Sequence, residues 1–312
     1  MKFIRESVFG GERPLYREKH LSLERVVIEP GESAIKEGAD IEVDHCEFRG
    51  KYPFWECDGF TIRDCLFREG ARAAIWYSRN GRMSDTLVEA PKMFREMENI
   101  ALENVRFTAA AETFWNCRGI RLRNVEVKGG DYIYMGSSDI DIEGYRQQGN
   151  YSFQYARRVT IRDAYLDTKD AFWNTEDITV CDSEIHGEYL GWYSKRLRLV
   201  RCRISGTQPL CYCDDLVLED CTFDPDADLA FEYSSVEADI LGRITSVKNP
   251  RTGRIVSDGY GEIILDSNIK SPGDCQILTR VGPDSTSIPS FRAEEPTASS
   301  GTISAKRPFP FG

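Results

Sequence analysis

Four carboxylates in the sequence are candidates for acid–base chemistry. They are Glu112, Asp131, Asp170 and Glu188. A pair of such groups can protonate a glycosidic oxygen and activate the attacking group, so glycoside hydrolysis is one reaction that they suit. When acids lie in a row, repulsion between like charges raises the pKa of one partner, as a general acid requires.

Tryptophans and basic residues occupy the same segments as these acids. The flat faces of tryptophan stack on the C–H faces of a sugar, and the candidates are Trp115, Trp173 and Trp192. Basic side chains bind a uronate or sulfate group, and one lysine can serve as the base of an elimination. The candidates are Lys51, Arg72, Lys92 and Lys169. These residue types predict a carbohydrate ligand, with hydrolase and lyase chemistry both open.

A repeat of 19 to 21 residues positions these side chains. In each unit the first, third, sixth and eighth residues are apolar or small, and the fifth is usually Asp or Asn. This pattern predicts a strand, a turn and a second strand, and the period is typical of a solenoid. The units start at Leu21, Ile41, Phe60, Gly81, Ile100, Ile120, Ile140, Val159, Ile178, Leu197 and Leu216.

A leucine-rich repeat is the main alternative, because the segment LRLVRCRI matches its core pattern. That repeat needs a leucine three residues before the core, where this chain mostly has small residues such as Cys57, Ser78 and Ala156. The segments between units, such as KYPFW and DAFW, are aromatic and too short for a helix. We therefore predict an all-β fold, a parallel β-helix of about 11 coils.

The repeat also divides the chain into regions. We expect an N-terminal cap over 1–20, the coils over 21–235, a closing coil or hairpin over 236–280, and an extended tail over 281–312. Cap residues are needed because the two ends of a repeat array otherwise expose apolar surface.

The segments between coils carry two columns of interest. All five tryptophans lie five residues before the next coil, and the preceding column is almost wholly apolar. Because side chains alternate across a strand, we expect Phe172 in the core and Trp173 exposed, although a buried tryptophan column is the alternative. The acids and bases named above lie eight or nine residues before each coil. Coils stack about 4.8 Å apart, so both retaining and inverting carboxyl spacings are within reach.

Cysteines and histidines do not predict a metal site. Most of the ten cysteines fall on inward positions, where a reduced thiol acts as a small apolar group. The histidines, His20, His45 and His186, are scattered and form no ligand spacing. We also find no phosphate loop, nucleophile elbow or other cofactor motif.

Composition limits the partners and the location. The net charge of −11 disfavours nucleic acid and anionic lipid, which both require a basic surface. The sequence has no apolar stretch of membrane-spanning length and no secretory h-region. We expect a cytoplasmic protein that takes a carbohydrate ligand and has no nucleic-acid or membrane partner, while its oligomeric state stays open.

The segments between coils also carry a family likeness. The segments include FGGERPLY, GESAIKE, KYPFW, ARAAIWYS, AETFWNC, KDAFWN, GEYLGWYS and SVKNPRTGRI. They resemble a bacterial family of pectate-lyase-like β-helix proteins that is classed as a domain of unknown function, over roughly residues 5 to 280. The resemblance implies a right-handed parallel β-helix and no particular activity.

Two classes of function follow from these observations. The first is a carbohydrate-active protein that hydrolyses or cleaves short glycans by general acid–base chemistry. The alternative is a protein without catalysis, either a carbohydrate-binding module or an assembly protein whose tryptophan row is a subunit interface.

Overall fold

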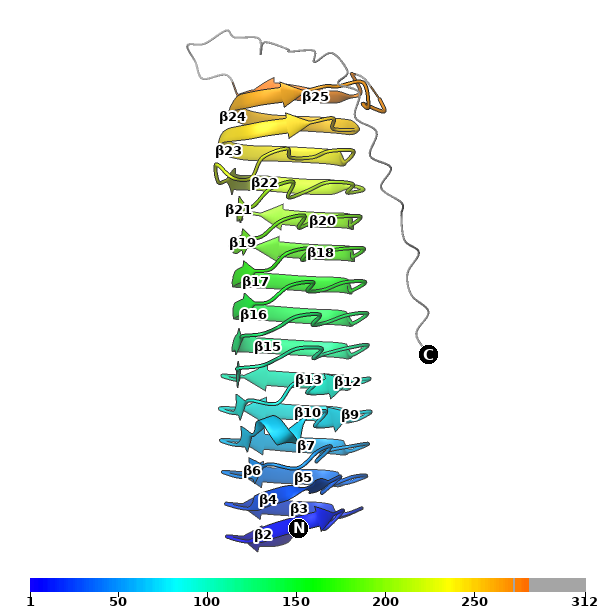
Figure 1. Cartoon of the computed structure of the whole chain (residues 1–312), viewed down its shortest axis with the longest axis vertical. Helices are drawn as coiled ribbons and strands as arrows, with labels where there is room; N and C mark the ends of the chain where they lie inside the picture. The colour runs from blue at the N-terminus through cyan, green and yellow to red at the C-terminus, as the bar shows by residue number, and fades with distance from the viewer. Residues whose placement is uncertain (272, 281–312) are drawn as a thin grey trace.

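Parallel strands stack along one long axis in the computed structural model, which describes residues 1–271 and 273–280 (Figure 1). Each coil contributes a first strand, a corner, a second strand and a return segment that leads to the next coil. Equivalent residues pair across coils: Ile41 with Phe60, and Ile100 with Ile120. The expected tail, 281–312, lies outside the described residues.

The first six coils have two separate strands each. The first strands are β1 (Lys2–Arg5), β3 (Lys19–Glu24), β5 (Ala39–Asp44), β7 (Asp58–Arg63), β10 (Arg79–Ser84) and β13 (Glu98–Glu103). The second strands are β2 (Val8–Glu12), β4 (Val27–Glu32), β6 (Glu47–Phe48), β8 (Leu66–Phe67), β11 (Leu87–Val88) and β14 (Arg106–Phe107). Return segments add β9 (Ile75–Trp76), β12 (Phe94–Arg95) and the 3-10 helix η1 (Glu69–Ala71).

The later coils include several that run as one long strand. Continuous strands are β15 (Arg118–Val127), β16 (Ser138–Gln148), β17 (Arg157–Asp167), β22 (Leu216–Phe223), β23 (Ser235–Lys248) and β24 (Thr252–Ile264). Two coils are split into β18 (Glu176–Cys181) with β19 (Glu184–His186), and β20 (Lys195–Val200) with β21 (Arg203–Ser205); the last strand is β25 (Cys275–Thr279). No helix in the described ranges is long and apolar enough to span a membrane.

The predicted all-β parallel β-helix is confirmed, and it has about 15 turns rather than 11. At the N-terminus, β1 and β2 pair in parallel with β3 and β4, so residues assigned to a cap form a coil themselves. At the other end, β23, β24 and β25 also pair in parallel, as a coil and not as a hairpin. The repeat pattern fades in these terminal coils, where residues such as Lys2 and Gly253 occupy the first position.

The core and the corners follow the sequence pattern. Inward residues of the first, third, sixth and eighth positions are buried, as shown by Leu21, Leu23, Val26 and Ile28. The fifth residue turns the chain with a positive φ, 48° at Asp64 and similar values at its equivalents. Asp and Asn tolerate this left-handed conformation better than most residues, which explains their frequency at the fifth position.

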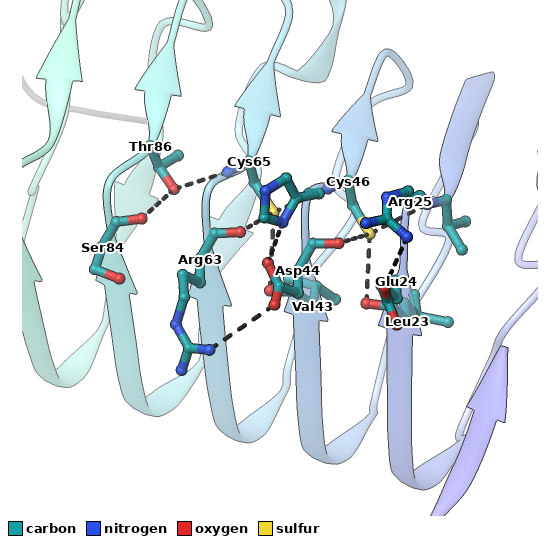
Figure 2. A network of polar contacts seen from close by, with 12 residues as sticks. Leu23, Glu24, Arg25, Val43, Asp44, Cys46, Arg63, Cys65, Ser84 and Thr86 are labelled. Atoms are coloured by element: carbon teal, nitrogen blue, oxygen red, sulfur yellow. Dashed lines mark hydrogen bonds and ion pairs between the residues drawn. The ribbon is translucent and has the colours of Figure 1, made fainter. Parts of the chain in front are cut away.

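Buried thiols take part in the backbone network of the corner. The amide N–H of Cys46 donates to Cys65 Sγ (3.3 Å), and the N–H of Cys65 donates to Thr86 Oγ1 (3.3 Å), as Figure 2 shows. Each of these side chains thereby accepts a hydrogen bond from a corner N–H group of the preceding coil. The strand pairing between coils does not provide a backbone partner for that N–H group. Burial raises the pKa of the Cys57 and Cys117 thiols to about 12, so these groups stay protonated and have a structural role.

Candidate functional site

The return segments present an inner and an outer aromatic column. The inner column is a continuous ladder in which Phe114, Tyr134 and Phe153 stack at centroid distances of 5.0 and 4.6 Å. Phe172, in the same column, is buried, whereas its neighbour Trp173 is half-buried. The predicted inward direction of the column is therefore correct. The tryptophans lie at the surface without being fully exposed; they are Trp55, Trp76, Trp115, Trp173 and Trp192.

In the N-terminal half of this return face, tryptophans pair with cations of the chain. The Arg95 guanidinium lies between Trp76 and Trp115, at 4.3 and 4.6 Å from the ring centroids. Trp76 Nε1 donates a hydrogen bond to the Lys92 carbonyl (2.7 Å), and Lys36 Nζ lies 5.9 Å from the Trp55 ring. These rings are therefore held in place by interactions within the chain.

Rings also contact one another in the N-terminal half, where Trp55 lies 5.5 Å from Trp76 and 5.2 Å from Tyr77. In the C-terminal half, aromatic rings form a longer row of such contacts. We call this group the aromatic strip; its members are Tyr155, Trp173, Trp192, Tyr193, Tyr212 and Tyr233. Successive centroid distances are 6.5, 6.2, 5.8, 5.1 and 5.2 Å. Tyr155 and Tyr193 are each 47% exposed.

The tyrosines of the strip were missed by the sequence reasoning. Each tyrosine is the residue immediately after the tryptophan-column position in its coil, as Tyr193 is after Trp192. A period-two reading assigns this residue to the interior. It lies outside because it has a positive φ, 58° at Tyr193, which turns the chain at a second corner.

The predicted column of acids and bases is two columns. The N–H of Glu112 donates to the carbonyl of Asp131 (2.9 Å), and that of Asp170 donates to the carbonyl of Glu188 (2.9 Å). Both pairs are on adjacent coils, as expected. Their members nevertheless occupy neighbouring columns, because one residue of each pair is at the positive-φ corner, Glu112 at 54° and Asp170 at 51°.

Most of the predicted basic residues are neutralised by acids of the chain. Lys51 Nζ lies 2.8 Å from Glu32, Lys92 Nζ lies 2.8 Å from Glu112, and Lys169 Nζ lies 3.4 Å from Glu188. Arg72 is exposed. The first three lysines are therefore poorly placed to bind an anionic ligand without losing these partners.

Among the four candidate acids, Asp170 has the most unusual environment. Glu112 is ion-paired, Asp131 is exposed and accepts a hydrogen bond from the Asn150 amide (2.7 Å), and Glu188 is exposed. Asp170 is only 4% exposed, and its Oδ1 has no hydrogen-bond partner. Burial raises the pKa of this carboxyl to about 6, and Lys169 only partly opposes the shift.

Other unpaired polar atoms lie near Asp170 in the chain. Six buried side-chain polar atoms of the described residues lack a partner, and four of these belong to residues between 154 and 194. They are Gln154 Nε2, Asp170 Oδ1, Trp192 Nε1 and Ser194 Oγ. Because buried polar groups are normally satisfied, this concentration marks the return face around the aromatic strip as the candidate site.

A hollow of about 420 Å³ adjoins the strip. Tyr155 lines it together with Gly136, Ser137, Ser138, Arg157 and Arg158. Gly136 has φ +68°, and Asn116 (52°) and Tyr155 (59°) share this conformation at the equivalent corner of the adjacent coils. The missing side chain of Gly136 opens the hollow beside the Tyr155 ring.

A larger hollow, of about 580 Å³, lies on another face, at the corner between first and second strands. Its rim includes Arg106 and Glu126, which form an ion pair with each other at 3.3 Å. We place the candidate site on the return face instead, because the unpaired buried groups are in the return segments.

One group of possible metal ligands occurs among the described residues. Ligand atoms of Asp44, His45 and Asp64 lie within 4.8 Å of one another, so His45 is less isolated than the sequence indicated. Asp44 already contacts His45 Nδ1 (2.5 Å) and Arg63 (3.8 Å), the latter shown in Figure 2. The group is open to solvent, and its contacts are explained without an ion.

One family model matches most of the chain. The family model described as "Protein of unknown function (DUF3737)" matches residues 2–278. No curated protein matches the chain.

Several solved structures resemble the fold at low identity. The surface adhesin PfbA of Streptococcus pneumoniae is 12% identical, with 86% of each chain covered and a TM-score of 0.45. The A-module of the mannuronan C-5 epimerase AlgE6 of Azotobacter vinelandii is 10% identical over 91% of this chain and 81% of that chain, with a TM-score of 0.32. The catalytic domain of a GH87 alpha-1,3-glucanase is 9% identical over 90% and 64%, with a TM-score of 0.27.

Proposed function

We propose that the aromatic strip of this protein, which belongs to the DUF3737 family, is a binding surface for a short oligosaccharide. The observation that carries this proposal is the row of six partly exposed aromatic residues on adjacent coils. Rings spaced by coil stacking offer repeated apolar contacts along the axis, and the hydroxyl and indole N–H groups beside them supply hydrogen bonds.

Polar groups around the strip support a ligand rich in hydroxyls. Trp192 Nε1 and Gln154 Nε2 are donors without partners, and Asp170 Oδ1 is an acceptor without one. Burial raises the pKa of Tyr212 to about 12, so its hydroxyl stays neutral and can both donate and accept. A sugar hydroxyl that reaches these atoms would replace interactions that the free protein lacks.

Acid–base catalysis is a second candidate function, favoured by Asp170 alone. A carboxyl group with a pKa near 6 is protonated in part at neutral pH, as a general acid requires. Glu188, on the adjacent coil, is the exposed carboxylate nearest to it along the stack and is the proposed base or nucleophile. Glu112 and Asp131 have weaker support, because neither lies on a coil adjacent to that of Asp170.

Tryptophan fluorescence during titration with neutral and uronate oligosaccharides tests the binding proposal. We expect a saturable shift for one sugar class. Trp192→Ala should weaken the affinity about tenfold, as loss of one stacking contact predicts. Trp115→Ala is the matched control in the same column and should bind as the wild type does.

Three outcomes separate the alternatives. A saturable shift with product formation that Asp170→Asn abolishes, while affinity persists, would establish catalysis. The same shift without any product identifies a binding protein. If no sugar binds and an oligomer dissociates on Trp173→Ala, the strip is a subunit interface and the carbohydrate proposal is wrong.

A further inference from the structure

Cations of the chain contact aromatic rings at several places on the return face. Arg95 lies between two tryptophans, and Lys36 lies over a third. At the far end of the aromatic strip, Lys270 Nζ lies 4.4 Å from the Tyr233 ring centroid and 5.9 Å from that of Tyr212. The chain itself thus shows which chemical group these rings accept.

Lys270 belongs to the segment between β24 and β25, outside the regular coils. This segment is attached by Asp266, whose Oδ1 accepts a hydrogen bond from Asn249 Nδ2 (2.8 Å) and whose N–H donates to Asn249 Oδ1 (3.1 Å). Lys270 itself is exposed. Its ammonium group therefore reaches the rings from a surface segment and can leave them without disturbing the core.

Charge around this end of the strip also favours a cation. Glu232 is buried beside the two tyrosines, where burial of the phenols and then the charge of Glu232 raise the pKa of both. Lys248 lies 3.0 Å from Glu232 and neutralises it in part, and Asp266 adds a second acid near Tyr233. Along the rest of the return face, Lys51, Lys92 and Lys169 are held by acids. An anionic sugar would have to displace these pairs, whereas an ammonium group would not.

We propose that Tyr212 and Tyr233 form a subsite for the ammonium group of an amino-sugar oligomer, and that Lys270 occupies this subsite in the free protein. The inference rests on the proposed function, because it names the sugar class that the strip would select. An amino sugar combines the C–H face that stacks on rings with the cation that these tyrosines accept.

The experiment compares two oligomers with the same sugar backbone, one with free ammonium groups and one with neutral N-acetyl groups. Isothermal titration of the full chain with a glucosamine tetramer and with its N-acetylated counterpart should show tighter binding of the cationic form. One exposed cation–π contact predicts a difference of roughly two- to fivefold. Lys270→Gln should strengthen binding of the glucosamine tetramer by a similar factor, because the subsite is then empty.

Matched variants test whether the gain belongs to this subsite. Lys36→Gln removes a cation from the Trp55 ring, outside the strip, and should leave the affinity for the glucosamine tetramer unchanged. In the background of Lys270→Gln, Tyr233→Leu should remove the preference for the cationic form, while circular dichroism shows whether the coil is intact.

The outcomes separate this inference from the proposed function. If both tetramers bind equally and Lys270→Gln changes neither affinity, the ammonium subsite is wrong and carbohydrate binding stands. If neither tetramer nor any other oligosaccharide binds, both proposals fail. If tetralysine competes at the strip and the glucosamine tetramer does not, the subsite takes a peptide cation and the amino-sugar inference is overturned.

Discussion

Tryptophans of the N-terminal half of the return face contact cations as well as other rings, whereas those of the C-terminal half contact rings without a cation from the described residues. Arg95 lies between Trp76 and Trp115, but within the described part of the chain neither Trp173 nor Trp192 has a cation over its ring. Both halves have the same inner ladder of stacked rings. The difference teaches that one column of a solenoid can stabilise the fold at one end and offer binding groups at the other.

Hydrogen bonding separates the same two halves. Indole N–H groups of Trp76 and Trp115 donate to carbonyls of the following coil, at Lys92 and Tyr132. Trp192 Nε1 is buried and has no partner. An unsatisfied group costs stability in the free protein, and a ligand that supplies an acceptor would recover it.

Removal of an inner ring should have the largest effect in either half. We expect Phe114→Ala and Phe172→Ala each to lower the free energy of unfolding by about 3–5 kcal/mol, because both side chains are fully buried in a stacked ladder. Urea unfolding followed by circular dichroism measures this change. A much smaller loss in one half would break the assumption that the inner ladder is common to both.

Asp170, in the C-terminal half, should make a pH-dependent contribution to the free energy of unfolding of the protein. Its pKa is about 6 in the folded protein and about 3.9 in the unfolded chain, so folding disfavours the charged form. The contribution of Asp170 to the free energy of unfolding should fall as pH rises from about 4 to about 6 and stay low above that range. Asp170→Asn should remove this fall and be more stable by about 2–3 kcal/mol at pH 8, with little difference at pH 3.5.

Asp131→Asn is the control for this pH profile. Asp131 is exposed and lies on the same face, so its substitution should not give the gain in unfolding free energy at pH 8 that we expect from Asp170→Asn. An unfolding free-energy difference between the wild type and Asp170→Asn that does not change between pH 4 and 7 would contradict the raised pKa of Asp170.

Truncation of an outer tryptophan should distinguish the halves directly. Trp115→Ala removes a ring that contacts Arg95 and a hydrogen bond to a carbonyl, and we expect a loss of about 2 kcal/mol. Trp173→Ala should cost less stability and weaken ligand binding instead. Thermal unfolding of both variants checks the order, and equal losses would remove the distinction between the halves.

The indole nitrogen gives the smallest and most selective test. Trp76→Phe removes the donor to the Lys92 carbonyl and should cost about 1 kcal/mol beyond the change in ring size. Trp192→Phe removes a donor without a partner and should be nearly neutral in the free protein. The comparison fails if Trp192→Phe destabilises the protein as much as Trp76→Phe does.

Coil architecture could be read from the sequence because it depends on local periodicity. Alternation of apolar residues placed Phe172 inside and Trp173 at the surface, and the fifth-position Asp and Asn residues marked a corner. The same reasoning stopped at 11 coils, because Lys2 and Gly253 begin coils whose first position is not apolar. Strand pairing continues there through backbone hydrogen bonds, which require no particular side chain.

Side-chain partners, in contrast, were decided by the tertiary structure. The spacing placed Glu112, Asp131, Asp170 and Glu188 on the return face, but a corner with positive φ divides them into two columns. Only the stacked coils show that Lys92 is held by Glu112, that Asp170 is buried, and that Lys270 reaches back to Tyr233. A repeat period specifies which residues share a face. Burial, ion pairing and pKa depend on neighbours about 20 residues away, which become adjacent only when the coils stack.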